Sequence, residues 1–303
     1  MANLEEKVRS GRFVITAEIV PPLSATPAKL LAEAELLKGK VDAINVTDAA
    51  AGKTTMSSFA SAALLAANGY EPILQVTCRD RNRIALAGDL IGAAAQGIRN
   101  LLILKGDDPK GGDQPDAKPV FDLESGQLLA LARDLRDKGE LPSGRKVEPP
   151  PRFFLGAADV PRRPDEKWKP GPLLAKIEAG AGFAQTQFGF DLDVVRAYIG
   201  RLNDEGITKR LGVIIGVGPI RSAKSARWMN ENLFGVHVPE ATIQRLEGAK
   251  DQAAEGRAIC AELIAGLREI RGVAGAHVMA PNNEGAIPDV IARARRVVKD
   301  RAA

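Results

Sequence analysis

The recurrence of short apolar runs between helical stretches constrains the fold of this chain more than any other feature of its sequence. The runs are rich in β-branched residues, and their apolar residues are continuous rather than alternating, as is typical of strands covered on both faces of a parallel sheet. The eight runs are Phe13–Val20, Val41–Val46, Pro72–Thr77, Ile98–Leu104, Phe153–Ala157, Phe183–Phe188, Leu211–Val217 and Gly272–Met279.

Helical patterns separate these runs, for example the apolar spacing between Leu30 and Leu37. Asp191 is a candidate N-cap, and Gly139 follows a charged last turn and is a candidate helix end. Repeated strand–helix units favour a closed (β/α)8 TIM barrel of the α/β class over an open doubly wound sheet. Because no linker divides the chain into compositionally distinct halves, we expect a single domain over residues 1–303.

Cysteine and charge usage predict a cytoplasmic protein that acts on small molecules. Cys78 and Cys260 are too few and too far apart for a disulfide framework, and residues 1–12 lack the apolar stretch of a signal peptide. No apolar run is long enough to span a bilayer. The net charge of +4 is a slight basic excess that suits an anionic substrate. Aromatic residues make up only 4% of the chain, which argues against a nucleic-acid surface.

Polar residues lie at the ends of the first three runs. In such barrels the functional residues lie at the C-terminal ends of the strands. Glu18 lies inside the first run, where burial would favour its protonated form and make it a proton donor near neutral pH. The alternative for Glu18 is an ion pair with a buried Lys or Arg. The second run ends at Thr47 and Asp48, before a small-residue loop that allows a ligand to approach the backbone.

The third run gives Gln75 and then a segment dense in hydrogen-bonding groups. The alternative interpretation of that segment is that Asp80 caps the next helix and that Arg79 and Arg81 are solvated.

The fourth and sixth runs end in groups suited to a ring system. Lys105-Gly106-Asp107 places a glycine between a cation and a carboxylate, which suits a flat ring or a phosphate, although turn chemistry also explains Gly106. Gln187 offers an amide donor and an acceptor, which match the edge of a pterin or a flavin. The neighbouring Phe188 and Phe190 are more typical of packing than of stacking platforms.

Other chemistries have weak support. His237 and His277 are the only histidines, too few and too separated for a zinc site, and we interpret them as structural. Gly216-Val217-Gly218 is followed by Pro219 and does not complete a dinucleotide-binding GxGxxG motif.

Five segments together resemble the methylenetetrahydrofolate reductase family over nearly the whole chain. Their order, spacing and placement on successive strands make the set specific, although no single segment is decisive. The segments are AEIVPP at 17–22, QVTCRDRN at 75–82, LKGDDPKGGDQPDAKPVFDLES at 104–125, KIEAGAGFAQTQFGFD at 176–191 and GVGPIRSAKS at 216–225.

The resemblance implies a barrel with FAD at its mouth, reduced by NADH or NADPH and reoxidised by 5,10-methylenetetrahydrofolate. Glu18 matches the family's general acid, which protonates the folate N10 so that the imidazolidine ring opens and hydride can be accepted. Asp107 matches a carboxylate beside flavin and pterin, and Gln187 matches an amide that contacts the substrate. The resemblance assigns these cofactor-binding positions: Thr47, Gln75, Lys105, Gly106, Asp107 and Ala157.

The sequence departs from the family pattern at three places. Gln75 stands where well-studied members carry a His, Asp159 lies in a segment that replaces an aromatic residue and a His, and Ala223 replaces an aromatic residue near the nicotinamide. These departures bear on adenine binding, flavin affinity and the choice between NADH and NADPH. They leave open a flavin-free reductase or a folate-binding methyltransferase barrel. The resemblance also implies a homo-oligomer.

Overall fold

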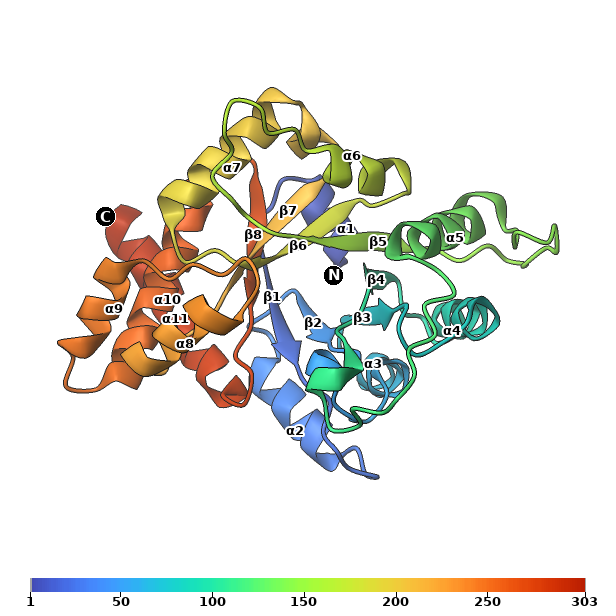
Figure 1. Cartoon of the computed structure of the whole chain (residues 1–303), viewed down its shortest axis with the longest axis horizontal. Coiled ribbons are helices and arrows are strands. Elements are labelled where there is room, and N and C mark those ends of the chain that lie inside the picture. The colour runs from blue at the N-terminus through green and yellow to red at the C-terminus, as the bar shows by residue number, and fades with distance from the viewer. Residues whose placement is uncertain (1, 303) are drawn as a thin grey trace.

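The computed structural model, which describes residues 2–302, confirms the predicted (β/α)8 barrel. Eight parallel strands pair in chain order, and β1 closes the sheet by pairing with both β2 and β8. Figure 1 shows the strands at the centre of the molecule with helices around them. The strands are β1 Val14–Ile19, β2 Ala43–Val46, β3 Pro72–Thr77, β4 Asn100–Leu104, β5 Phe154–Asp159, β6 Phe183–Phe188, β7 Gly212–Val217 and β8 Val273–Val278.

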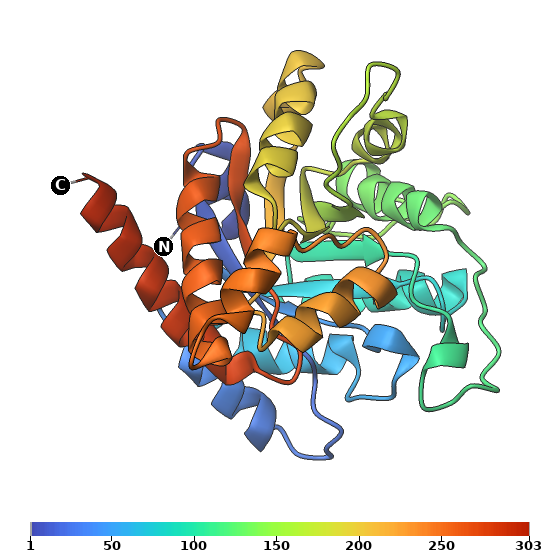
Figure 2. The ribbon, with the colours of Figure 1, turned by 60° about the vertical axis from the view of Figure 1, so that its left-hand side comes forward.

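Helices form the outer layer of the barrel. The helix α1 precedes the first strand, and α8, α9 and α10 all lie between β7 and β8. Figure 2 shows α10 and α11 packed side by side on one flank. The α-helices are α1 Leu4–Arg9, α2 Ala28–Leu37, α3 Ser58–Ala67, α4 Arg83–Ala95, α5 Ser125–Lys138, α6 Gly171–Glu178, α7 Leu192–Asp204, α8 Ala223–Asn232, α9 Glu240–Glu247, α10 Gln252–Arg268 and α11 Ile287–Ala302. Short 3-10 turns are η1 Ala50–Gly52, η2 Pro109–Gly111, η3 Ile207–Lys209 and η4 Glu284–Ala286.

Local sequence sets several element ends as predicted. The side chain of Asp191 accepts hydrogen bonds from the backbone N–H groups of Asp193 and Val194, at 2.8 and 3.2 Å, and so caps α7. Gly139 ends α5 in the left-handed conformation, with a φ of 59° that glycine adopts at low cost. Each predicted run overlaps its strand, and the ends differ by at most two residues. The strand β5 extends to Asp159, two residues beyond the predicted run.

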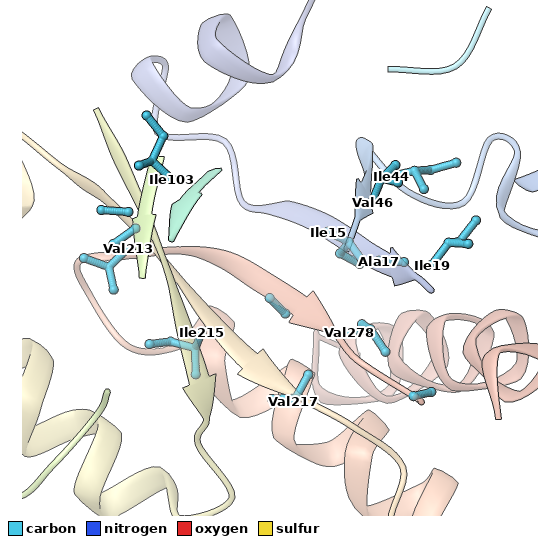
Figure 3. Packing of buried hydrophobic residues seen from close by; sticks show 14 of the residues in the cluster. Ile15, Ala17, Ile19, Ile44, Val46, Ile103, Val213, Ile215, Val217 and Val278 are labelled. Atoms are coloured by element: carbon cyan, nitrogen blue, oxygen red, sulfur yellow. The ribbon is translucent and has the colours of Figure 1, made fainter. Parts of the chain in front are cut away.

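Strand side chains alternate between two packed regions. Residues such as Ile15, Ala17 and Ile19 belong to the large core cluster that also includes the helices, and Figure 3 shows side chains of this cluster on β1, β2, β4, β7 and β8. A smaller cluster at the N-terminal ends of the strands fills the barrel interior and includes Leu4 of α1. This end of the barrel is therefore closed by apolar packing. The members of the smaller cluster are Leu4, Val14, Ala43, Ile73, Leu102, Phe154, Phe183 and Ile214.

Tight packing inside the barrel depends on one glycine of β5. The rings of Phe154 and Phe183 lie 4.8 Å apart, centre to centre. A Cβ on Gly156 would lie 2.2 Å from the Phe183 ring, so only glycine leaves room for it.

The structure agrees with the sequence on the cysteines, because Cys78 and Cys260 are both buried and unpaired. Within residues 2–302, no helix is both long and apolar enough to cross a membrane. The same part of the chain contains no group of three or more His, Cys, Asp or Glu side chains that could hold a metal ion.

Candidate functional site

Two cavities lie at the C-terminal ends of the strands, where function was expected. The larger, about 650 Å³, is lined by Phe188 at the end of β6, by the start of α8 and by Met279 after β8. The smaller, about 330 Å³, is lined by residues after β2, β3 and β4, among them Lys53 and Arg79. The loop after β2 borders both, because Ala51 lines the larger cavity and its neighbours line the smaller one. A third cavity, about 570 Å³, lies at the opposite end of the barrel and contains none of the predicted site residues.

Glu18 lies near the end of β1 with its side chain 14% exposed. Its Oε2 accepts a hydrogen bond from Nε2 of Gln75 at 3.3 Å. The same oxygen lies 3.7 Å from Nε2 of His277 on β8. The basic side chain next to Glu18 is therefore a histidine rather than the Lys or Arg of the alternative interpretation. Gln75, assigned to the cofactor by resemblance, thus contacts Glu18 in this structure.

Four buried polar side chains form a layer inside the barrel, one step below Glu18. The hydroxyl of Thr16 lies 2.9 Å from Nδ1 of His277. Nε2 of Gln185 lies 3.1 Å from the Thr16 hydroxyl and 3.3 Å from the same ring nitrogen. Nδ2 of Asn45 lies 3.4 Å from the other ring nitrogen, Nε2.

Sequence reasoning missed this layer because it treated each histidine as isolated. The strand period of two could have revealed part of it, because Thr16 and Glu18 share one face of β1 and Asn45 and Thr47 share one face of the segment at β2.

Asp107 is exposed at the mouth and joins two loops. Its Oδ2 accepts the backbone N–H of Ala51 at 2.7 Å, and its carbonyl oxygen accepts a hydrogen bond from Nη1 of Arg79 at 3.1 Å. Nη2 of Arg79 also donates to the carbonyl of Ala49 at 3.3 Å. Ala49 and Ala51 have φ values of 49° and 55°, which are costly for residues with a Cβ. Asp107 and Arg79 thus hold a strained loop in place.

The alternative interpretation of the segment after β3 is wrong. The side chain of Arg79 is only 2% exposed and pairs with Asp80 at 2.7 Å, and this hydrogen bond raises the pKa of Arg79. Arg81 forms an ion pair with the buried Asp48. The side chain that caps α4 is Asn82 rather than Asp80. These arginines organise the loops of the mouth instead of facing solvent.

Gly106 is required by the protein's own packing. Its φ of 97° lies in the region that favours glycine, and a Cβ there would lie 2.9 Å from Cβ of Arg79 and 3.1 Å from Cβ of Thr77. Turn geometry and close packing therefore explain this glycine without a ring against it.

Thr47 and Gln187 offer polar groups at the mouth. The hydroxyl of Thr47 is buried and has no hydrogen-bond partner among residues 2–302, which is unusual for a buried polar atom and suits a ligand contact. Oε1 of Gln187 accepts the backbone N–H of Phe188 at 3.0 Å, which fixes the orientation of the amide.

The side chain of Lys105 is exposed, whereas the side chain of Ala157 is buried. Lys105 is exposed, and its Nζ lies 5.7 Å from the centre of the Phe121 ring. Ala157 belongs to the large core cluster beneath the helices, so its methyl group is used in packing. A ligand at the mouth could meet the backbone of Ala157 but not its side chain.

Aromatic side chains line the larger cavity. The rings of Phe188 and Phe190 stack with centres 5.1 Å apart, which agrees with the packing role expected for them, and both also face the cavity. Trp228 of α8 lines the same cavity and is 54% exposed. Arg221 and Lys224 add positive charge to this apolar surface.

The other two departures from the family pattern, Asp159 and Ala223, form hydrogen bonds within the protein. Asp159 accepts a hydrogen bond from the hydroxyl of the buried Tyr198 at 2.5 Å, and burial together with the charge of Asp159 raises the pKa of Tyr198. Ala223 begins α8, and its N–H donates to Gln252 at 3.0 Å.

Known proteins resemble this chain in both sequence and fold. A family model described as methylenetetrahydrofolate reductase matches residues 3–295. A probable methylenetetrahydrofolate reductase (NADPH) of Caenorhabditis elegans is 27% identical over 79% of this chain, which spans 34% of that protein. The 5,10-methylenetetrahydrofolate reductase of Escherichia coli is 26% identical over 61% of this chain, which spans 56% of that protein. The chain thus covers about a third to a half of these relatives.

Solved structures share the fold at low sequence identity. An uncharacterized protein from Clostridium thermocellum that binds two copies of 5-methyl-5,6,7,8-tetrahydrofolic acid superposes with a TM-score of 0.67 at 14% identity, over 98% of this chain and 99% of that one. A riboflavin lyase with modified FMN superposes with a TM-score of 0.57 at 10% identity, over 96% and 92%. At these identities the likeness shows the fold alone.

Proposed function

Because the chain belongs to the methylenetetrahydrofolate reductase family, we propose that it reduces 5,10-methylenetetrahydrofolate to 5-methyltetrahydrofolate with electrons from NADH or NADPH through bound FAD. The observation that carries the proposal is the position of Glu18, a carboxylate that lies inside the barrel near its mouth and is only partly exposed. A carboxylate in such a place can exchange a proton with a ligand at the strand ends.

The groups at the mouth fit a flavin nucleotide. The buried, unpartnered hydroxyl of Thr47 is available to a polar ring edge, and the smaller cavity beside it carries the positive charge of Lys53. The small side chains of residues 49–52 expose backbone groups to a ligand. We assign Thr47, this loop and Lys105 to flavin binding. FAD held by these residues would supply the hydride that reduces the substrate.

Glu18 acts as the general acid in this proposal. Opening the imidazolidine ring breaks the bond between N10 and the one-carbon unit, and the departing N10 takes the proton from Glu18. The electron-poor carbon left on N5 is then ready for reduction. The Glu18 carboxylate regains a proton before the next turnover, so that one proton is consumed for each ring opened.

Asp107, Gln187 and the larger cavity position the substrate. Gln187 presents its amide to the pterin edge, while the Asp107 carboxylate lies beside pterin and flavin. The aromatic lining of the larger cavity suits the flat aminobenzoyl part of folate, and Arg221 and Lys224 suit its carboxylates.

The visible absorption spectrum of the purified protein, recorded before and after addition of FAD, tests the proposal directly. We expect flavin absorbance, its bleaching by NADH or NADPH, and its recovery on addition of methylenetetrahydrofolate. Oxidation of NADH or NADPH by the folate without any flavin would indicate a flavin-free reductase. Binding of methyltetrahydrofolate with neither property would indicate a methyltransferase barrel and contradict the reductase.

A further inference from the structure

The cavity at the end of the barrel opposite the mouth, about 570 Å³ in volume, has no part in the proposed function. It lies where the last elements of the chain meet the first ones. Residues of α10 and α11 form one side, and the start of β1 and the loop between α2 and β2 form the other. Figure 2 shows α11, in red, beside α10 on this flank. The volume is typical of sites for small molecules.

Positive charge dominates the lining of this cavity, which we call the basic cavity. Among the described residues that line it, Asp42 carries the only carboxylate. That carboxylate is already engaged, because it accepts the backbone N–H of Ile15 at 2.8 Å and pairs with Lys7 at 3.1 Å. The cationic residues of the lining come from four segments and are Arg12 before β1, Lys40 after α2, Arg268 at the end of α10 and Arg295 on α11.

Neutral groups hold three of these cationic side chains in place. Cζ of Arg268 lies 4.6 Å from the centre of the Phe13 ring. Nη2 of Arg295 donates to the carbonyl of Lys40 at 3.1 Å, and Nζ of Lys40 donates to the carbonyl of Leu36 at 2.7 Å. None of the four cationic side chains forms an ion pair with a carboxylate in the part of the chain that the structure describes. Their positions are therefore fixed while their charges stay uncompensated.

An anion would resolve the repulsion between these like charges. A guanidinium has several N–H donors and pairs with two oxygens of one phosphate, so the donors that remain suit phosphate groups. Val41, Ala294 and Val298 add an apolar wall. We propose that the basic cavity binds an organic phosphate, a small molecule that joins two phosphate groups to an apolar or planar part, as a nucleoside diphosphate does.

The amount of charge favours phosphate over carboxylate. A phosphate monoester carries about 1.5 to 2 negative charges at pH 7, so two phosphate groups approach the charge of the cationic residues, whereas a single carboxylate does not. The inference does not depend on the proposed function, because none of the residues assigned to flavin or folate lines the basic cavity.

A ligand in the basic cavity would connect the two ends of the fold. Arg12 and Lys40 flank the first strand and the first helix of the barrel, whereas Arg268 and Arg295 belong to its last two helices. A diphosphate that contacts both pairs stabilises the closed barrel. Because such a ligand binds the folded chain and not the unfolded one, it raises the melting temperature.

Isothermal titration calorimetry with ADP tests the proposal. We expect wild-type protein to bind ADP, and Arg268→Gln to bind it about 10-fold more weakly or worse, because a charge-assisted hydrogen bond is lost. Arg12→Gln should have a similar effect. The Arg12 side chain forms no hydrogen bond or ion pair with the described residues, so this variant removes charge without removing a contact of the fold. Pyrophosphate should bind more weakly than ADP, because it leaves the apolar wall uncovered.

Arg152→Gln is the matched control. Arg152 is exposed just before β5, at the same end of the barrel, and lines none of the three cavities. The variant loses the same charge and should keep the wild-type affinity for ADP. In thermal denaturation, ADP should raise the melting temperature of the wild type and of Arg152→Gln more than that of Arg268→Gln.

Four results would overturn the proposal. Wild-type protein that does not bind ADP would contradict it directly. An affinity unchanged in both Arg12→Gln and Arg268→Gln would place ADP elsewhere, and an affinity weakened equally in Arg152→Gln would indicate general attraction to a basic surface. Pyrophosphate that binds as tightly as ADP would exclude a role for the apolar wall and thus an organic phosphate.

Discussion

The carboxylate of Asp107 accepts the backbone N–H of Ala51 at 2.7 Å and so joins the loop after β4 to the loop after β2. Ala51 has a φ of 55°, and this contact helps to hold it in that costly conformation. The loop borders both cavities of the mouth. The charge of Asp107 and its role as a loop anchor can therefore be separated by substitution.

Asp107→Asn should retain an oxygen for the Ala51 N–H while removing the charge. We expect unchanged thermal stability, a shifted flavin reduction potential and weaker folate turnover. Asp107→Ala, the matched comparison, should also lower the free energy of unfolding by about 1 kcal/mol because it loses the hydrogen bond. Redox titration and thermal denaturation distinguish the two effects. If Asp107→Asn changed neither potential nor turnover, Asp107 would serve the loop alone.

Glu18→Gln should separate the two half-reactions. Flavin reduction by NADH or NADPH needs no proton from Glu18 and should be nearly intact. Folate reduction should slow by at least about 100-fold, because general-acid catalysis typically contributes about 10²- to 10⁴-fold. Stopped-flow absorbance follows the bleaching and the recovery of the flavin separately. Equal slowing of both steps would assign Glu18 a structural role.

Gly106→Ala should destabilise the protein even without flavin. The added Cβ meets Arg79 and Thr77, and the φ of 97° is unfavourable for alanine, so we expect a loss of about 1–3 kcal/mol in the free energy of unfolding. Gly111→Ala is the matched control, because a Cβ there meets no atom within 4 Å. Urea denaturation of both apoproteins measures the difference. A Gly106→Ala protein as stable as the wild type would contradict the packing explanation.

Tyr198→Phe should lower stability because it removes the hydroxyl that donates to Asp159 from a fully buried ring. Leaving the Asp159 carboxylate without this donor should cost about 1–2 kcal/mol. Tyr70→Phe removes a comparable hydrogen bond, to Glu35 at 2.6 Å, at the surface and should change stability by less than about 0.5 kcal/mol. Similar losses in the two variants would show that burial does not control the cost.

Stability should decrease as the pH rises above about 9. Burial, with a smaller contribution from Glu124, raises the pKa of the Cys78 thiol to about 11, and burial raises the pKa of Cys260. Unfolded thiols ionise near pH 8.5. Below that pH both states keep their protons and this contribution is fully present. Above it the unfolded chain releases protons that the folded chain retains, so the free energy of unfolding decreases.

Urea denaturation at several pH values between 8 and 10.5 measures this slope. Cys260→Ala should have a shallower slope than the wild type, whatever its stability at pH 8. A wild-type free energy of unfolding that stayed constant or rose over this range would contradict the prediction.

The sequence by itself determined the barrel and the approximate position of its mouth. Parallel strands covered on both faces are mostly apolar, so the strands were visible as largely apolar runs that only a few polar residues interrupt. Local signals such as the Asp191 N-cap depend only on neighbouring residues, so the sequence alone predicted them as well. Strand ends identified Glu18, Asp107 and Gln187 as candidates because chain order places the ends of parallel strands at one edge.

Only the tertiary structure decided which of these side chains meet. Thr16 and His277 are 261 residues apart and come into contact because β8 closes the barrel against β1. Closure depends on the register of all eight strands together, so no local pattern reveals it. The burial of Arg79 and the need for glycine at position 106 have the same origin, because both arise where loops from β2, β3 and β4 pack against one another.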